Sequence, residues 1–340
     1  MPVDTLPLVP RRPAPYGVVL NANAGRVTPR LARRIERVVG SDHVFLSESE
    51  EHAREILQTC VERGYGTVFA GGGDGTILQA VNTLRDLAGD DAPPVGVLRL
   101  GTGNALARHL GSGLPLLELL RWQSPRVAYH RVPVRLLEHG DTLFPFGGMG
   151  IDAAVLNDYL ALRQRHGGSG WRKLFSGLSG YLIAGLGMTI PRFLKRPLAE
   201  VEVVNLGGPA WRCGTGGVRI GDPIPTGGVL YKGPASTLGV ATTPLIGYGM
   251  RLFPYACRVP DRFQLRLLNF TPLQCARHMV SAWQGTLDHP QCHDFYVERI
   301  KIRSTRALPL QLGGDALGHA FDATFGLAEQ PVTFVGRTQG

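Results

Sequence analysis

The chain has 340 residues, of which 44% are apolar and 19% charged, and its formal net charge is +9 at pH 7. This composition is ordinary for a globular protein and excludes extended disorder, while the length allows two domains with large cores. The positive charge admits nucleic acid, anionic lipid or a nucleotide as a partner, but the arginines lack the interleaved aromatic residues of a single-strand binder, so we expect no nucleic acid.

Cysteine spacing and hydropathy bear on the compartment. The five cysteines are widely spaced and form no C-x-x-C pair, so neither a disulfide framework nor a zinc site is expected, and a reducing compartment, the cytoplasm, is favoured. No run of about 18 unbroken apolar residues occurs, and residues 1–13 lack a signal-peptide pattern. These first residues are rich in proline and are predicted to form a disordered lead-in.

The first elements alternate strand and helix. A strand is predicted at Tyr16–Leu20, followed by a turn at Asn21–Gly25. Residues Arg30–Val39 predict a helix with Leu31, Ile35 and Val38 inward and four arginines outward. A second strand is predicted at His43–Leu46, before a helix at Glu48–Arg63. Ser47 could cap that helix, because Glu50 stands three residues later as in a capping box.

The central stretch is Gly64–Asn82. Thr67–Ala70 predicts a buried strand, Gly71–Gly73 break it, and Thr76 begins an apolar helical pattern. A strand, a glycine turn and a helix start together direct backbone N–H groups at one anion, and glycine lets the backbone approach a phosphate. Asp74 is an anion like the phosphate, so a cation or a hydrogen-bond donor must lie between the two. This suggests a Mg²⁺–nucleotide, or an aspartate that orients a reacting hydroxyl. The alternative is a tight turn with a solvated aspartate.

A second corner of the same kind follows. Pro94–Leu100 predicts a strand, Gly101–Gly103 a turn, and Asn104 the start of a helix. Two such corners predict a doubly wound α/β domain whose strand ends share one crevice. Asn104 is also a good helix N-cap, and both roles are compatible.

These segments resemble the diacylglycerol kinase and sphingoid-base kinase family. Gly72–Thr76 matches its GGDGT signature, and three further segments resemble its N-P-x-S-G, L-G-T-x-N-D-x-A and G-x-D-A motifs: Asn21–Gly25, Leu100–Ala107 and Gly150–Ala153. The resemblance implies that ATP is held by Asn21, Ser47, Gly72, Gly73, Asp74, Gly75, Thr76, Gly101, Thr102 and Asn104, with Asp74 organising Mg²⁺. Ala105 replaces an aspartate that the family usually has, and this is closer to sphingoid-base kinases.

From about Val132 the pattern changes to short alternating runs separated by turns, which predicts an antiparallel β-sandwich. We therefore predict a nucleotide-binding domain at 14–132 and a lipid-substrate domain at 133–330, and the family resemblance implies that a strand within 331–340 returns to the first domain. The predicted runs are Arg131–Leu137, Leu143–Met149, Glu200–Asn205, Gly217–Ile220, Gly228–Tyr231, Phe263–Leu268 and Arg299–Ile302.

One long helical tract, Asp152–Leu194, interrupts these runs, and its second half is apolar with basic flanks. It could dock on an anionic membrane with Trp171 and Tyr181 at headgroup depth, or it could pack over the sandwich. The basic residues at its two ends are the expected lipid contacts: Arg172, Lys173, Arg192, Lys195 and Arg196.

Two further acids have predicted roles. Asp152 would orient the substrate hydroxyl, or it could simply cap the following helix. Asp315 stands where the family has the glutamate of D-G-E-P-L, and Gly313 replaces the preceding aspartate. Asp315 would accept the proton of the lipid hydroxyl, unless it is only a turn residue. Arg262 beside Asp261 would repel a divalent metal, so the structural metal of some bacterial members is not expected there.

The sequence therefore predicts an ATP- and Mg²⁺-dependent kinase that phosphorylates diacylglycerol or a sphingoid base while in peripheral contact with the membrane. Two alternatives remain open. The first is a catalytically impaired nucleotide- or lipid-binding protein, because of Gly313 and Ala105. The second is a kinase of a soluble substrate, such as an NAD kinase. Neither the lipid nor the oligomeric state follows from the sequence.

Overall fold

The computed structural model describes residues 15–124, 126–127, 129–166, 177–194 and 197–337. It divides the chain into two compact units, Met1–Arg135 with Glu329–Gly340, and Leu136–Ala328. The predicted fold class, an α/β domain followed by an antiparallel β domain, is confirmed. No helix in the described ranges is both long and apolar enough to span a bilayer.

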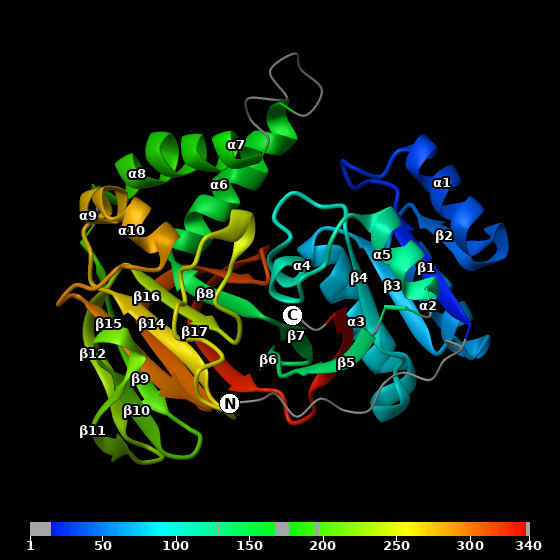
Figure 1. Ribbon diagram of the computed structural model, residues 1–340. Helices are drawn as coiled ribbons and strands as arrows, with labels where there is room; N and C mark the ends of the chain where they lie inside the picture. Colours follow the sequence, from blue (N-terminus) through cyan, green and yellow to red (C-terminus); the bar gives the residue numbers. More distant parts are fainter. Residues whose placement is uncertain (1–14, 125, 128, 167–176, 195–196, 338–340) are drawn as a thin grey trace. The chain divides into compact units, whose positions relative to one another are not determined.

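The described strands of the first unit form a six-stranded sheet in the order β2-β1-β3-β4-β18-β5 (Figure 1). Neighbouring strands are parallel from β2 to β18, and β5 alone runs antiparallel to its neighbour. The strand β18 comes from the end of the chain and lies between β4 and β5. The bounds are β1 Tyr16–Asn21, β2 Val44–Ser47, β3 Thr67–Gly72, β4 Val95–Arg99, β5 Tyr129–Val134 and β18 Val332–Arg337.

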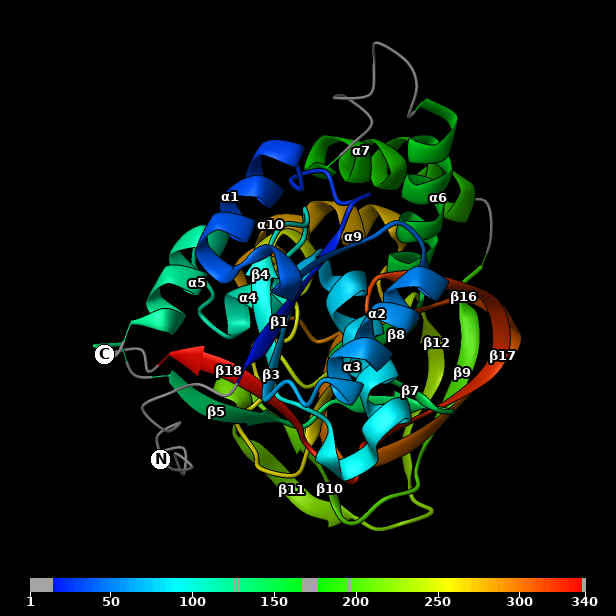
Figure 2. The same cartoon turned by 90° about the vertical axis from the view of Figure 1, so that its right-hand side faces the viewer.

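Helices cover both faces of this sheet, as Figure 2 shows. Two of them, α1 (Pro29–Val39) and α5 (Pro115–Gln123), share a core with the sheet that includes Ile35, Leu119 and Trp122. On the other face lie α2 (Glu50–Glu62) and α3 (Asp74–Ala88), with the short α4 (Ala105–His109) after β4. Short 3₁₀ turns occur at Ser41–His43 and Gly89–Asp91.

The helix α1 follows its sequence pattern closely. The Thr28 hydroxyl accepts a hydrogen bond from the Leu31 N–H at 3.2 Å, and Pro29 occupies the first turn, where no partner for its nitrogen is needed. Ile35 is fully buried and the arginines are exposed. The prediction of an apolar inner face and a basic outer face is confirmed.

Several predicted boundaries of the first unit differ from the structure by one or two residues, and those at the glycine stretch matter most for the site. The strand β3 continues through Gly71 and Gly72, which pair with Leu98 and Arg99 of β4, and α3 begins at Asp74 instead of Thr76. Glycine is a weak strand former, but here the flanking parallel strands supply the hydrogen bonds.

The described strands of the second unit form a twelve-stranded sheet. Its main path is β11-β10-β15-β14-β13-β8-β16-β17-β6-β7, and β9 bridges β16 to β12. The bounds are β6 Leu137–His139, β7 Thr142–Phe144, β8 Phe146–Gly150, β9 Ala199–Asn205, β10 Ala210–Cys213, β11 Arg219–Ile224, β12 Val229–Ala235, β13 Thr237–Ala241, β14 Phe263–Leu268, β15 Cys292–Val297, β16 Arg299–Leu312 and β17 Asp315–Leu327.

The described helices of the second unit gather along one side of this sheet (Figure 1). The helical tract begins one residue earlier than predicted and contains a π-helical segment, Ala184–Thr189. Trp171, Arg172, Lys173, Lys195 and Arg196 lie outside the described residues. The helices are α6 Ile151–His166, α7 Gly177–Ile183, α8 Ile190–Leu194, α9 Pro272–Arg277 and α10 Met279–Gln284, with 3₁₀ turns at Thr215–Gly217 and Gly247–Gly249.

The predicted run Arg131–Leu137 was wrong as a single strand of the β domain. It is divided between β5, which belongs to the first sheet, and β6, which belongs to the second. Alternation along one strand cannot reveal which partner it pairs with, and here β5 pairs with β18, about 200 residues later.

Candidate active site

The glycine stretch predicted to bind phosphate lies where β3 ends and α3 begins. Gly73 is the N-cap residue of α3, and no side chain bonds the first turn of the helix from that position. The helix has 15 residues, and the N–H groups of its first turn have no partner within the helix. These donors and the helix dipole favour an anion at this end.

A second glycine brings the neighbouring loop against this turn. A Cβ atom at Gly101 would lie 2.1 Å from Gly73 Cα and 2.8 Å from Gly73 N. The Leu100 N–H also donates to the Gly72 carbonyl oxygen at 3.1 Å. The ends of β3 and β4 are therefore in backbone contact, which only glycine at 101 permits.

Asn21 connects the end of β1 to the same turn. Its Nδ2 donates to Thr76 Oγ1 at 2.9 Å, and its Oδ1 accepts from the Asn23 N–H at 2.9 Å. In the sheet Asn21 is the register partner of Ser47, at the end of β2. Four neighbouring parallel strands thus end in the residues predicted to hold the nucleotide, as the doubly wound topology requires.

Ser47 does not cap the following helix. Its side chain is buried, and its Oγ donates to the Leu20 carbonyl oxygen at 3.4 Å. The N-cap of α2 is Ser49, whose Oγ accepts from the His52 N–H at 3.1 Å. The predicted capping box with Glu50 is therefore wrong by two residues, because the strand β2 extends through Ser47.

Asn104 holds the loop between β4 and α4 in place. Its φ is +52°, its Nδ2 donates to the Gly101 carbonyl oxygen at 2.6 Å, and its Oδ1 accepts from the Gly101 N–H at 3.2 Å. It occupies the N-cap position without a side-chain cap bond, so the predicted capping contact is absent. Thr102, in the same loop, is exposed.

The carboxylate of Asp74 takes the capping role instead. Its Oδ1 accepts from the Leu106 N–H at 3.1 Å, so it joins the start of α3 to the first turn of α4. Burial raises the pKa of Asp74, while backbone N–H groups of residues 104–106 and the charge of Arg108 oppose this rise. Asp74 is thus a half-buried acceptor beside the anion position, a place from which it could also hold a cation.

In the second unit, Asp152 lies in the first turn of α6, directly after β8. Gly150 has a φ of +109°, and a Cβ atom there would lie 2.2 Å from the Ser236 carbonyl oxygen. The Oδ1 atom of Asp152 is buried without a hydrogen-bond partner. Burial raises the pKa of Asp152 to about 6, although the Ala153 N–H and the Gln311 side chain bond the carboxylate and oppose the rise.

Asp315 begins β17 on an exposed hairpin. Gly313 and Gly314 form its two-residue turn with φ values of +61° and +97°, a pair of positive angles that two-residue hairpins favour and glycine permits. The replacement of the family's aspartate by Gly313 thus coincides with a backbone conformation that side chains disfavour. Asp315 itself is exposed and pairs in register with Leu312.

Gln311, near these acids, escaped the sequence analysis, and Tyr181 has surroundings that the sequence did not predict. Gln311 bonds Asp152 and also accepts the Gly314 N–H at 3.1 Å, so it connects α6 to the hairpin turn. Tyr181, expected at headgroup depth, packs between Tyr159 and Tyr248, and burial followed by the Asp152 charge raises its pKa. In the sequence, only the position of Gln311 shortly before the Gly-Gly turn could have indicated that it contributes to the site.

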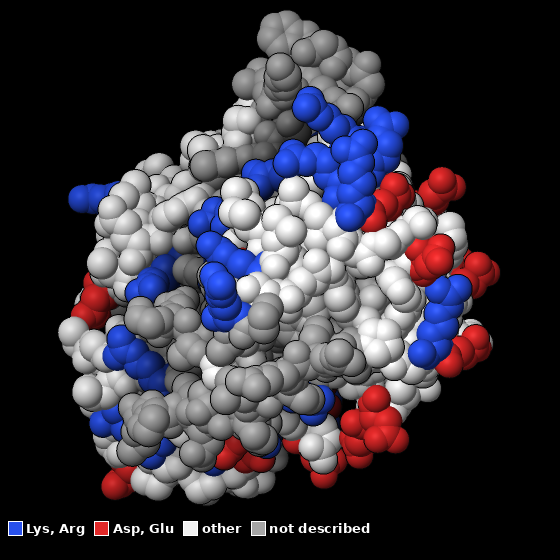
Figure 3. Space-filling view, turned by 45° about the vertical axis from the view of Figure 1, so that its right-hand side comes forward, with Lys and Arg blue, Asp and Glu red and all other residues white. Residues whose placement is uncertain are grey.

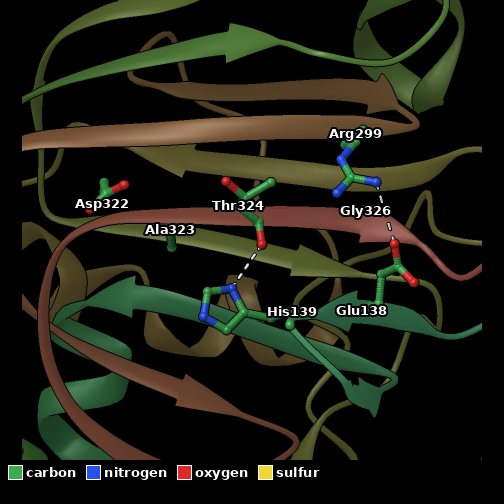
Figure 4. A pocket seen from close by; sticks show the side chains of 8 residues that line it. Glu138, His139, Arg299, Asp322, Ala323, Thr324 and Gly326 are labelled. Atoms are coloured by element: carbon green, nitrogen blue, oxygen red, sulfur yellow. Dashed lines mark hydrogen bonds and ion pairs between the residues drawn. The ribbon is translucent and has the colours of Figure 1, made fainter.

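A separate polar cavity of about 240 Å³ lies beside β6 and β17 (Figure 4). His139 Nδ1 lies 2.8 Å from the Thr324 carbonyl oxygen, and Arg299 pairs with Glu138 at 3.4 Å. None of the predicted site residues lines this cavity. Within the described ranges, no group of three or more His, Cys, Asp or Glu side chains could hold a metal ion.

The raised pKa of Asp152 gives a testable pH dependence. The folded state binds this proton more tightly than the unfolded chain, whose carboxyl has a pKa of 3.8, so the stability should fall as the pH rises from about 4 to 6. Above that window the buried charge costs about 1–3 kcal/mol. The variant Asp152→Asn should therefore be more stable than the native chain at about pH 8 and nearly equal at about pH 4. Thermal unfolding at both pH values measures this, and an equal difference at both would contradict the raised pKa.

Comparison with known proteins agrees with this geometry. Residues 15–125 match the family model of the diacylglycerol kinase catalytic domain. The probable lipid kinase YegS of Shigella flexneri is 24% identical over 285 residues, which cover 81% of this chain and 80% of that protein. A probable YegS-like lipid kinase of Serratia proteamaculans is 27% identical over 268 residues, 75% and 73% of the two chains.

A crystal structure of a diacylglycerol kinase from Bacillus anthracis superposes with a TM-score of 0.62 at 15% identity, covering 95% of this chain and 96% of that one. At this identity the superposition establishes the fold. The resemblance to diacylglycerol kinases is confirmed by the matched catalytic domain, and so is the prediction of an enzyme of the kinase class.

Proposed function

We propose that the chain transfers the γ-phosphoryl group of ATP, with Mg²⁺, to the hydroxyl of a lipid, either diacylglycerol or a sphingoid base. The observation that carries the proposal is the glycine turn at the start of α3. No side chain caps the helix there, and the backbone of Gly101 packs directly against Gly73. The matched catalytic domain and the names of the relatives support the same chemistry.

The nucleotide would lie along the ends of β1 to β4. Its phosphates would accept bonds from the N–H groups of Gly75 and Thr76 in the first turn of α3. Asn21 and Ser47 would contact it from the adjoining strand ends, with Thr102 and Asn104 from the loop after β4. Gly72 and Gly73 let the backbone approach, because a Cβ at Gly72 would lie 2.4 Å from the Thr76 hydroxyl oxygen.

Asp74 would hold Mg²⁺ through its carboxylate. The ion commonly takes one or two protein carboxylates, and its other ligands are phosphates and waters, so one acid in this loop fits the requirement. Bound there, Mg²⁺ would neutralise charge on the β- and γ-phosphates.

The lipid hydroxyl would react at the acids of the second unit. Its oxygen forms a bond to the γ-phosphorus as the bond from that phosphorus to the β–γ bridging oxygen breaks, and its proton passes to the carboxylate of Asp315. Asp152 would orient the hydroxyl, since its buried Oδ1 lacks a hydrogen-bond partner and could accept from one. Gln311 would hold Asp152 and the hairpin turn together.

We further propose that the enzyme acts in the cytoplasm at the surface of an anionic membrane, with the helical tract α6–α8 facing the lipid. Leu186 and Leu194 of this tract are 48% and 56% exposed, which supports contact with acyl chains. Arg192 forms an ion pair with Asp158 at 2.8 Å. Its charge is therefore less available to lipid headgroups than its place in the sequence suggests.

The test is incubation with labelled ATP, Mg²⁺ and mixed micelles that contain diacylglycerol, monoacylglycerol, sphingosine or ceramide. Label in one lipid identifies the substrate. Tight ATP binding without label in any lipid would favour the impaired binding protein. Label in a soluble acceptor such as NAD, with none in lipid, would favour the soluble-substrate kinase. Either of the last two results contradicts the proposal.

A further inference from the structure

The helix α5 of the first unit is apolar on two opposite faces. Its inner side chains Leu119 and Trp122 belong to the core that the sheet shares with α1. On the outer side Leu114, Leu117 and Leu120, spaced three residues apart, are 69%, 42% and 45% exposed. A helix that is apolar on both faces is normally buried on both, so the outer leucines indicate a surface with a partner.

The neighbouring helix α1 presents mainly positive charge to the solvent, since it has four exposed arginines and one acid, the half-buried Glu36. It adjoins α5 in the same core, and Gln123 Nε2 of α5 donates to the Val38 carbonyl oxygen of α1 at 2.8 Å. The outward side chains of α1 are four arginines spaced i, i+3, i+4 and i+7, which places them in one stripe of about 100°. These are Arg30, Arg33, Arg34 and Arg37, and all are exposed.

In the described part of the chain, no acidic side chain forms an ion pair with this stripe, Glu36 of the same helix included. Figure 3 shows the basic side chains gathered over α1. Like charges at i, i+4 repel one another and weaken the helix, and a negatively charged partner would relieve that repulsion.

We propose that Leu114, Leu117 and Leu120 together with the four arginines, here termed the α1–α5 surface, dock on an anionic lipid bilayer. The leucines would enter the acyl boundary and the guanidinium groups would contact phosphate headgroups. The inference rests on the proposed function in one respect, since a lipid kinase meets its substrate at a bilayer. It assigns to the nucleotide-binding unit a membrane contact separate from the helical tract α6–α8.

Other partners fit the surface less well. A second copy that used the same face would bring two stripes of four arginines together, and their repulsion opposes such a dimer. Nucleic acid would pair with the arginines but would leave the leucines in water, and the aromatic residue of α5, Trp122, is buried. A bilayer with anionic headgroups satisfies both the charge and the apolar side chains.

The test is co-sedimentation of the full chain, without ATP, with vesicles of equal parts phosphatidylcholine and phosphatidylglycerol or of phosphatidylcholine alone. We expect binding to the anionic vesicles that weakens as salt is added. The variant R33Q/R37Q should weaken it about 25-fold, at roughly fivefold per charge. The variant L117Q/L120Q should weaken it about tenfold or more.

Two matched control variants distinguish the effect of this surface from the effect of removing any two positive charges or any exposed apolar side chain. R54Q/R85Q removes the same charge from α2 and α3, and Val229→Gln changes a side chain of β12 that is 51% exposed. Both should bind vesicles like the native chain. Thermal unfolding checks that every variant is folded, because Arg85 is half-buried and contacts Asp86.

Three results would overturn the proposal. The first is a native chain that does not bind anionic vesicles. The second is a loss with R54Q/R85Q as large as with R33Q/R37Q. The third is a dimer in solution that L117Q/L120Q dissociates, which would assign the leucines to a second copy. Turnover on micellar lipid is scored separately: turnover without vesicle binding overturns the docking alone, and vesicle binding without turnover overturns the kinase alone.

Discussion

Replacing Asp315 by asparagine is expected to lower kcat for lipid phosphorylation by about 10²–10⁴-fold, the usual contribution of a general base. Asparagine has the size of aspartate but cannot accept the proton of the substrate hydroxyl. Residue 315 follows a turn whose two glycines supply the positive φ angles, so the hairpin should keep its shape. The affinity for ATP should be unchanged, because the glycine loop that would hold the phosphates belongs to the other unit.

Steady-state kinetics with labelled ATP and a micellar lipid measure this effect, and calorimetric titration measures ATP binding. The matched control is Asp322→Asn, because Asp322 is an exposed aspartate on the same strand β17 and pairs with Lys301 at 3.3 Å. That variant should retain native turnover. Equal turnover in Asp315→Asn and the native chain would show that Asp315 is not the general base. Another residue would then have to accept the proton of the lipid hydroxyl.

The parts of the site that could be predicted are those specified by local physics. A run of glycines between a β-branched strand and an apolar helical pattern has few other uses than a close backbone approach, and Gly72–Thr76 lies at such a corner. The helix α1 was likewise predictable, because the 3.6-residue period separates Ile35 from the arginines within the helix itself.

Contacts between distant segments could not be predicted. The bond from the Leu106 N–H to Asp74 joins the first turns of α4 and α3, between residues 32 apart in the sequence, and it gives the aspartate a structural role that its position in the motif does not reveal. The Gln311 contact with Asp152 depends on the pairing of β16 with β8, which is set by the register of the second sheet. A capping serine two residues from the expected one shows that helix starts depend on where the preceding strand ends.

Replacing Gly101 by alanine is expected to lower the affinity for Mg²⁺–ATP by about 10²-fold and to destabilise the first unit by about 1–3 kcal/mol. The added Cβ would lie 2.1 Å from Gly73 Cα and 3.1 Å from the Gly72 carbonyl oxygen, and these backbone atoms cannot rotate away. The loop after β4 must therefore move off the start of α3. That movement would strain the bonds from the Leu100 N–H to Gly72 and from Asn104 to Gly101.

Calorimetric titration with Mg²⁺–ATP and thermal unfolding measure the two effects. Gly187→Ala is a suitable control, because a Cβ there has no neighbour within 4 Å and the residue lies in the π-helical segment of the second unit. It should bind ATP like the native chain. If Gly101→Ala unfolds at the native temperature and binds ATP with native affinity, nucleotide binding does not depend on the contact between the backbones of Gly73 and Gly101.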